Sequence, residues 1–144
     1  MTDDARILPR LSPPALPYWE GCRVGELRLQ HCPACGHVQF PPRSHCTRCR
    51  HGSLTWRAVS GRGTVASFTW VHLPLTEAWA EDVPYALALI RLDEGPLLMT
   101  NVRECAPERL AIGLPVEVCF EQRSEAIHLP QFRPARPTPK EAEA

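Results

Sequence analysis

The sequence lacks a long apolar run and a secretory leader. No hydrophobic stretch approaches the roughly 18 residues that a helix needs to cross a bilayer. The chain opens with Met1-Thr2-Asp3-Asp4, which is acidic and leads into no apolar segment, so it does not match a signal peptide. We therefore expect a cytoplasmic protein with no membrane partner, in a compartment where thiols stay reduced.

Catalytic sequence motifs are missing as well. The chain has no phosphate-binding glycine loop, no GxSxG and no HExxH. Glu77, Glu81 and Asp82 are close in sequence, but acids in an exposed loop are usually only solvated. His72 and His128 are isolated histidines. We expect no catalytic residue, and therefore an accessory or binding module rather than an enzyme.

Acidic residues are absent from residues 27–76, although the whole chain has a formal net charge of zero. That stretch carries six arginines, whereas residues 77–125 carry ten acids against four arginines. Two interpretations stay open. Fifteen arginines against one lysine can reflect nucleotide composition, with the charges merely solvated. Alternatively, the basic stretch faces an anion and the acidic part faces solvent or a partner.

Four of the seven cysteines form two CxxC pairs, namely Cys32, Cys35, Cys46 and Cys49. In a reducing compartment such pairs indicate metal ligation before disulfides. Two CxxC turns that meet supply four thiolates in a closed tetrahedral shell, which is typical of structural zinc. Gly36 fits the tight turn after the first pair. The other cysteines lack a neighbouring base, so we expect small buried or half-buried fillers at Cys22, Cys105 and Cys119.

Other chemistries compete for the CxxC pattern. Iron in a rubredoxin-like site uses similar turns, but Arg50 stands here where glycine is usual. A histidine could replace one cysteine, although four well-spaced thiolates leave no vacancy for His31, His37, His45 or His51. A redox-active dithiol uses a single CxxC at a helix start. A closed zinc shell has no position for water, so we expect the metal to fold residues 27–55 and to do no chemistry.

Apolar periodicity predicts a mainly β chain that begins with a short helix at 16–24 and a strand at 26–31. The alternation in 63–73 places Val65, Ser67 and Thr69 on one face. The almost wholly apolar 85–92 predicts a strand buried on both faces. About five strands in so short a segment favour a closed Greek-key barrel, which removes exposed edges. The expected strands after the metal site are 56–60, 63–73, 85–92, 97–102, 116–121 and 126–132, with a helical turn at 107–110 before the fifth.

In this order, the motifs resemble the zinc-ribbon/OB-fold proteins catalogued as domain of unknown function thirty-five and found beside thiolases. The resemblance covers roughly residues 16–136 and rests on PYWEG, GELRLQHCPACGHVQFPPRSHCTRC, SGRGTVASFTWVH, VPYALALIRLDEGPLLMTNV and IGLPVEVCFE. It implies a short N-terminal helix, a rubredoxin-like zinc ribbon and a five-stranded OB-fold barrel. The expected division is a leader and helix at 1–25, the ribbon at 26–55, the barrel at 56–133 and a flexible tail at 134–144.

The resemblance further implies a non-catalytic subunit that docks onto a thiolase-fold enzyme, such as a thiolase, an acyltransferase or a steroid side-chain aldolase, or onto an enoyl-CoA hydratase. In such complexes the small protein helps form the coenzyme A channel, so acyl-CoA would bind at a shared site. Arginine meets phosphate bidentately. The candidates for the coenzyme A phosphates are Arg43, Arg48, Arg57 and Arg62, whose alternative role is solvated surface.

Two other functions stay open. Ribbons and OB barrels also form single-stranded nucleic-acid-binding modules. The neutral net charge and the lack of clustered strand aromatics argue against this, so we expect no nucleic acid. The third possibility is a free-standing acyl-CoA-binding protein.

Overall fold

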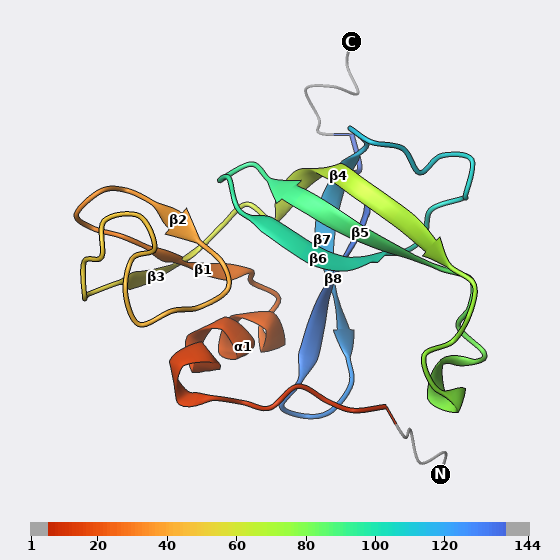
Figure 1. Cartoon of the computed structure of the whole chain (residues 1–144), viewed down its shortest axis with the longest axis horizontal. Coiled ribbons are helices and arrows are strands. Elements are labelled where there is room, and N and C mark those ends of the chain that lie inside the picture. Colours follow the sequence, from red (N-terminus) through yellow and green to blue (C-terminus); the bar gives the residue numbers. More distant parts are fainter. Residues whose placement is uncertain (1–5, 138–144) are drawn as a thin grey trace.

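Two β-sheets, one short α-helix and two 3-10 helices form the regular structure of the computed structural model, which describes residues 6–137 (Figure 1). The fold class expected from the sequence, mainly β with an N-terminal helix and a closed five-stranded barrel, is confirmed. Within residues 6–137, no helix is long and apolar enough to span a bilayer. The helices are η1 Pro13–Ala15, α1 Leu16–Arg23 and η2 Glu77–Trp79. The small sheet has the strand order β2 Val38–Gln39, β1 Arg28–His31 and β3 Thr55–Ala58, and the barrel has the order β4 Arg62–Val71, β5 Tyr85–Leu92, β6 Leu97–Val102, β8 His128–Pro134 and β7 Pro115–Gln122.

Helix α1 forms where the sequence predicts it. A proline stands in its first turn, where a missing N–H costs nothing, and the chain leaves it through Gly25 at φ +80°. Tyr18 and Cys22 are buried, whereas Trp19 packs against the core from a half-buried position. Close packing requires glycine at position 21, because a Cβ there would lie 2.8 Å from the carbonyl oxygen of Glu26. The helix can therefore lie close to the chain that leads into β1.

The small sheet contains one strand that the sequence pattern assigned to the barrel. All four residues of β3 pair with β1, from Thr55 opposite His31 to Ala58 opposite Arg28. The expected strand 56–60 is thus the third strand of the metal-binding sheet, and the predicted boundary between residues 55 and 56 falls inside it. The physical reason is that β2 has only two residues, so β1 needs a longer partner on its other edge.

A β-bulge in β4 changes the predicted faces of that strand. The register against β5 shifts between Val65 and Ser67. Val65 is therefore on the core side together with Phe68 and Trp70, whereas Ser67 and Thr69 are exposed. Simple alternation had placed Val65, Ser67 and Thr69 on one face, and that expectation was wrong because one extra residue inverts the phase.

Strand β5 is buried on one face only, contrary to the expectation from its apolar sequence. Ala86, Ala88, Ile90 and Leu92 are each at most 2% exposed, whereas Leu89 is 37% exposed on the outer side. Leu89 pairs with Met99 of β6, which is 71% exposed, while Leu87 is half-buried. The β5–β6 outer face, defined by Leu87, Leu89, Leu97 and Met99, is thus an apolar surface open to solvent.

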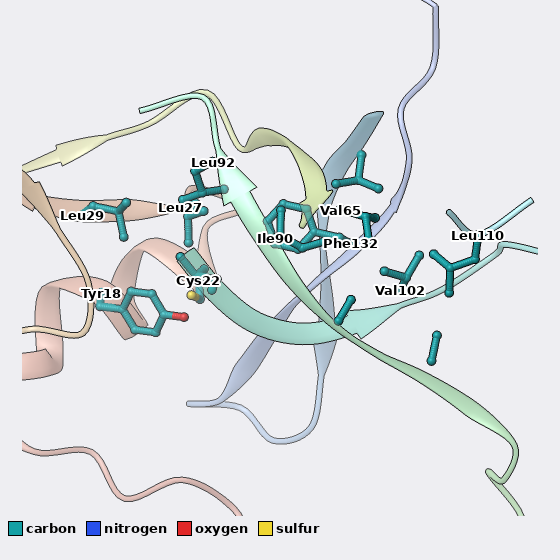
Figure 2. Close-up of a cluster of buried hydrophobic side chains, with 14 residues drawn as sticks. Tyr18, Cys22, Leu27, Leu29, Val65, Ile90, Leu92, Val102, Leu110 and Phe132 are labelled. Carbon is teal, nitrogen blue, oxygen red and sulfur yellow. The ribbon is translucent and has the colours of Figure 1, made fainter. Parts of the chain in front are cut away.

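One continuous core joins helix, ribbon and barrel (Figure 2). Tyr18 and Cys22 of α1 and Leu27 and Leu29 of the ribbon belong to the same cluster as the barrel core. Phe132, at 0% exposure, fills the barrel centre. Barrel members of the cluster are Val65, Ala86, Ala88, Ile90, Leu92, Leu98, Val102, Leu110, Val116 and Phe132.

The ends of the described chain are tied to the barrel. Nε of Arg6, in the segment predicted as a leader, donates to the Ala78 carbonyl at 3.0 Å. Pro134 is the last residue of β8, and the Ala135 N–H donates to Pro115. Residues 1–5 and 138–144, including most of the predicted tail, lie outside the described residues. The segment predicted as a helical turn at 107–110 forms hydrogen-bonded turns, and no helix is assigned there.

Candidate metal centre

The two CxxC turns bring all four predicted cysteine ligands together. The Sγ atoms of Cys32, Cys35, Cys46 and Cys49 all lie within 4.8 Å of one another. The Sγ atoms of Cys32 and Cys49 are 3.5 Å apart, and those of Cys35 and Cys46 are 3.6 Å apart. Zinc at about 2.3 Å from four tetrahedral sulfurs requires sulfur separations of about 3.8 Å. The donor set and its size therefore fit one tetrahedral zinc ion.

Backbone hydrogen bonds repeat in the two turns. Cys32 N–H donates to His37 and Gly36 N–H donates to Cys32, each at 2.9 Å. The second turn has the same pair of bonds, from Cys46 to His51 and from Arg50 to Cys46, also at 2.9 Å. Each turn is thus a closed loop that fixes the direction of its two sulfurs.

The residue after the second CxxC adopts the backbone conformation of its glycine counterpart. Gly36 has φ +73° and Arg50 has φ +65°. Arginine at this position had been the one departure from the usual pattern. The left-handed conformation costs a residue with a Cβ about 1–2 kcal/mol, so the metal turn is formed here in spite of local strain.

N–H groups of the second turn point at a sulfur. Cys49 N and Arg48 N each lie 3.4 Å from Sγ of Cys46. The Cys49 N–H is the main cause that lowers the pKa of Cys46, to about 6. A thiolate at neutral pH is the form that binds a metal.

Two buried glutamines, which the sequence analysis missed, connect the turns. Gln30 is 5% exposed and Gln39 is 4% exposed, and Nε2 of Gln39 donates to Oε1 of Gln30 at 3.0 Å. Gln30 accepts from the Arg43 N–H and donates to the Arg43 carbonyl, and Gln39 accepts from the Thr47 N–H. The available sequence signal was that both glutamines occupy inward-facing positions of β1 and β2. Two polar residues in such short strands do not show whether they form a buried hydrogen-bond network or lie on the surface.

The nearby histidines have other contacts. Nδ1 of His31 lies 3.2 Å from the Leu29 carbonyl, and Nε2 of His37 lies 3.2 Å from the Thr47 hydroxyl. Nδ1 of His45 lies 2.9 Å from the Ser44 hydroxyl. The one cluster of potential metal ligands found in residues 6–137 contains only cysteines. A four-sulfur shell is closed, so a zinc held there organises the chain and has no free position for a reacting water.

The four arginines predicted to meet coenzyme A phosphates come from different places. Arg43 follows the Pro41-Pro42 loop, Arg48 lies inside the second CxxC turn and Arg57 is on β3, and all three are exposed. Arg62 begins β4 and is half-buried. None of the four guanidinium groups forms an ion pair with a carboxylate of residues 6–137. Their role toward coenzyme A stays a prediction.

Fold and site together define a rubredoxin-like zinc ribbon followed by an OB-fold barrel. Two family models match in that order: "ChsH2, rubredoxin-like zinc ribbon domain" over residues 19–55 and "ChsH2, C-terminal OB-fold domain" over residues 56–121. The chain belongs to the ChsH2/DUF35 family of zinc-ribbon/OB-fold proteins.

Relatives within this family have different names and lengths. A "DUF35 domain-containing scaffold protein" of Methanothermobacter thermautotrophicus is 34% identical over 95 residues, covering 65% of this chain and 71% of that protein. A "Probable enoyl-CoA hydratase alpha subunit" of Thermomonospora curvata is 36% identical over 122 residues, covering 83% of this chain. The match covers only 37% of that hydratase subunit's own length.

A solved structure described as "Ltp2-ChsH2(DUF35) aldolase" contains a similar chain. The TM-score is 0.80 at 31% sequence identity, with 90% of this chain and 100% of that chain covered. The expected family and its fold are thereby confirmed, and a rubredoxin-like zinc ribbon with four cysteines close together agrees with the expected structural zinc.

Proposed function

We propose that this chain is a non-catalytic zinc-binding subunit that docks onto a thiolase-fold enzyme of acyl-CoA or lipid metabolism. The observation that carries the proposal is the likeness over nearly the whole chain to the DUF35 chain of an aldolase. Relatives named scaffold proteins support a structural role. A relative named "3-oxo-4,17-pregnadiene-20-carboxyl-CoA hydratase alpha subunit" supports acyl-CoA chemistry in the assembly and supports a hydratase as a further candidate partner.

An apolar surface for docking is available on the barrel. The β5–β6 outer face carries Leu89 and Met99 at 37% and 71% exposure. Leu73 and Leu75, in the segment after β4, are 84% and 86% exposed. Large exposed apolar groups close together are typical of protein contact surfaces. We infer that the enzyme subunit covers part of this surface.

The coenzyme A contact belongs to the same proposal. Arg43, Arg48, Arg57 and Arg62 have no acidic partner among residues 6–137, so their charge is available to an external phosphate. Binding of single-stranded nucleic acid has less support. Phe68 and Trp70, the strand aromatics that could stack on bases, pack against the core instead.

Native co-purification tests the docking. The tagged full-length chain is isolated from its own cells without denaturant, and bound proteins are quantified by mass spectrometry. We expect to recover a thiolase-fold enzyme in near-stoichiometric amount. Met99→Glu, which places a charge on the apolar face, should lower the amount of enzyme recovered. Arg109→Glu, at an exposed position outside this surface, is the control. Recovery of the chain alone, or only with proteins of other folds, would contradict the proposal.

A further inference from the structure

A hollow lies where the segment between β4 and β5 meets strands β5, β6, β7 and β8, and none of the four zinc-binding cysteines lines it. Its volume is about 210 Å³. A cavity of about 150 Å³ inside a protein is large enough to hold benzene. The hollow therefore has room for one aromatic group but not for a large cofactor. The lining residues within the described chain are Arg6, Trp79, Asp82, Tyr85, Asn101, Val102, Arg103, Glu121 and Gln131.

One wall of the hollow is aromatic. The rings of the half-buried residues Trp79 and Tyr85 have centroids 6.1 Å apart and are tilted by 44°. The Arg6 guanidinium lies 4.7 Å from the Trp79 ring centroid, and its Nε donates to the Ala78 carbonyl at 3.0 Å. These contacts hold the wall in place before any occupant arrives. A further ring packed against it gains the attraction of aromatic neighbours at a small cost in ordering.

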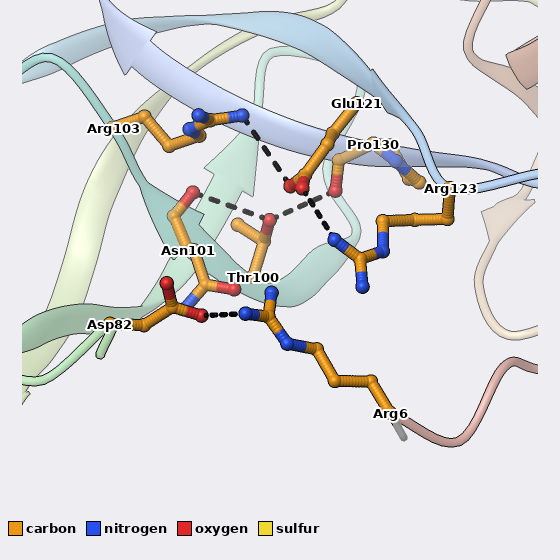
Figure 3. A network of polar contacts seen from close by, with 8 residues as sticks. All are labelled: Arg6, Asp82, Thr100, Asn101, Arg103, Glu121, Arg123 and Pro130. Carbon is orange, nitrogen blue, oxygen red and sulfur yellow. Dashed lines mark hydrogen bonds and ion pairs between the residues drawn. The ribbon is translucent and has the colours of Figure 1, made fainter. Parts of the chain in front are cut away.

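The ionic groups of the lining pair with one another. Nη2 of Arg6 lies 2.9 Å from Oδ2 of Asp82, and Figure 3 shows this pair apart from the Arg103–Glu121 pair. Nη1 of Arg103 lies 3.4 Å from Oε2 of Glu121, which also pairs with Arg123 from outside the lining. The lining thus holds two guanidinium groups and two carboxylates. A charged occupant would lose its hydration without gaining an unpaired counter-charge, so the hollow favours a neutral one.

The hollow also holds a buried acceptor that lacks a donor. Gln131 is 9% exposed, and its Oε1 is buried without a hydrogen-bond partner among residues 6–137. The other amide of the lining is already used, because Nδ2 of Asn101 donates to the Ala86 carbonyl at 3.0 Å. Buried polar groups in proteins are nearly always paired with protein, water or ligand. A carbonyl oxygen needs a donor, so the occupant that completes this site carries an O–H or N–H group.

The hollow is continuous with the apolar surface proposed for docking. Asn101 of the lining pairs across the sheet with Leu87 of the β5–β6 outer face. Trp79 belongs to the same segment between β4 and β5 as Leu73 and Leu75, which are 84% and 86% exposed. A protein that covers this surface therefore reaches the hollow as well.

We propose that the hollow receives a tyrosine side chain of the docked enzyme subunit. The ring packs against Trp79 and Tyr85, and the phenol hydroxyl donates to Oε1 of Gln131. A tyrosine side chain is neutral at pH 7 and combines a flat apolar body with a donor. Tyrosine is also enriched among the side chains that contribute most to protein interfaces. This inference rests on the proposed docking, to which it adds the chemistry of one contact.

The contact is tested first without the enzyme. The probe is N-acetyl-tyrosinamide, and its counterpart is N-acetyl-phenylalaninamide, which lacks only the hydroxyl. The zinc-loaded full-length chain is titrated while its amide and indole NMR signals are followed. We expect saturable shifts at Trp79, Tyr85 and the Gln131 side chain, with half-saturation at about 1–10 mM for so small a molecule. The phenylalanine amide should bind about fivefold more weakly, because one hydrogen bond is missing. No saturable shift at these residues, or equal binding of the two amides, would overturn the proposal.

Variants of the acceptor separate the hydrogen bond from the general attraction between aromatic rings. Gln131→Leu should bind the two amides equally, because the acceptor is gone while the aromatic wall remains. Gln131→Met, which keeps the length of the side chain, repeats the test where the amide spectrum of Gln131→Leu is not that of a folded chain. Gln122→Leu, at an exposed position outside the hollow, should keep the preference of about fivefold. A preference that persists without the Gln131 amide would contradict the assignment.

Native co-purification then tests whether the enzyme uses the hollow. Gln131→Leu and Trp79→Ala should each lower the amount of thiolase-fold enzyme recovered with the chain, whereas Gln122→Leu should not. If Met99→Glu lowers the recovery and the two variants of the lining do not, the docking surface stands and the tyrosine contact is wrong. If no thiolase-fold enzyme is recovered with the parent chain, the docking and the tyrosine contact both fail.

Discussion

At the scale of single residues, Arg50 shows how metal binding overrides local preference. It occupies the left-handed region at φ +65°, in the place that corresponds to Gly36. Its backbone N–H bond to Cys46 is needed to close the second turn. The residue is therefore held in position by the sulfur shell and the turn, and not by its own conformational preference.

Replacing Arg50 with glycine should stabilise the zinc-loaded protein. Glycine removes the left-handed penalty of about 1–2 kcal/mol but makes the unfolded chain more flexible, so we expect a net gain of about 0.5–1 kcal/mol. Urea unfolding of Arg50→Gly against the parent chain measures it. Arg48→Gly is the control, since Arg48 is not at positive φ and should lose stability instead. Equal effects of both changes would show that Arg50 is not strained.

Cys22 makes stability depend on alkaline pH. Burial raises its pKa from 9.0 to about 12, and burial also raises the pKa of Tyr18 beside it. Above pH 9 the unfolded chain loses the Cys22 proton while the folded chain keeps it, so stability falls as pH rises toward 12. By about pH 10.5 the loss from this thiol is about 2 kcal/mol.

Cys22→Ala should remove that part of the pH dependence. The variant starts less stable, because a fully buried sulfur is deleted, yet its stability should fall less between about pH 8 and about pH 10.5, by about 2 kcal/mol. Urea unfolding at the two pH values gives the comparison. Val116→Ala is the control, because it deletes buried apolar volume but no titratable group. Parallel pH curves for Cys22→Ala and the parent chain would contradict the assignment.

At the scale of elements, the ribbon is the part whose folding depends on an ion. Its sheet consists of a two-residue strand and two four-residue strands, and residues 40–54 between them form no helix and only turns and loops. A unit of this size buries little apolar surface, and many such units stay unfolded until a metal binds. The glutamine pair Gln30–Gln39 ties β1 and β2 to Arg43, His45 and Thr47 of the second metal turn and the loop before it.

Loss of one sulfur should unfold the ribbon. Cys46→Ser is expected to lower bound zinc from about one per chain to near zero, because three thiolates leave the shell open. Amide hydrogen exchange should then become fast throughout residues 28–58, and it should also become faster in the barrel strands, because ribbon and barrel share one core. Zinc is measured by elemental analysis and exchange by mass spectrometry. Cys105→Ser, outside the cluster, should retain zinc. Retention of zinc and protection in Cys46→Ser would show that the four cysteines do not form the shell.

Sequence patterns predicted the elements better than their faces and partners. The bounds of β5 and β6 and the grouping of the four cysteines followed from periodicity and spacing, which are local signals. The bulge after Val65, the pairing of β3 with β1 and the one-sided burial of β5 depend on contacts between distant segments. The relative positions of the arginines proposed for coenzyme A are set by tertiary structure too, so spacing alone could not group them.

At the scale of the whole molecule, ribbon and barrel share one core and α1 lies between them. The helix contacts β1 and β3 of the ribbon and β7 and β8 of the barrel. Leu29 of the ribbon is 1% exposed and belongs to the cluster that contains Ile90 and Leu92 of the barrel. Two units joined by buried apolar groups in this way should lose their structure together rather than one after the other.

Leu29→Ala tests that coupling, because it creates a cavity in the ribbon but should weaken the barrel as well. Large-to-small changes in a core cost about 2–5 kcal/mol. We expect the urea midpoints reported by zinc release and by amide exchange in β5 to fall by the same amount and to stay coincident.

Leu97→Ala, at 38% exposure on the outer side of β6, is the control and should change either midpoint little. If zinc release shifts while β5 keeps its protection, ribbon and barrel fold independently, and a partner enzyme could then bind the barrel of the zinc-free chain. Coincident shifts mean instead that the zinc ion supports the barrel and its β5–β6 outer face, so that the cysteine shell and the docking surface form one cooperative structure.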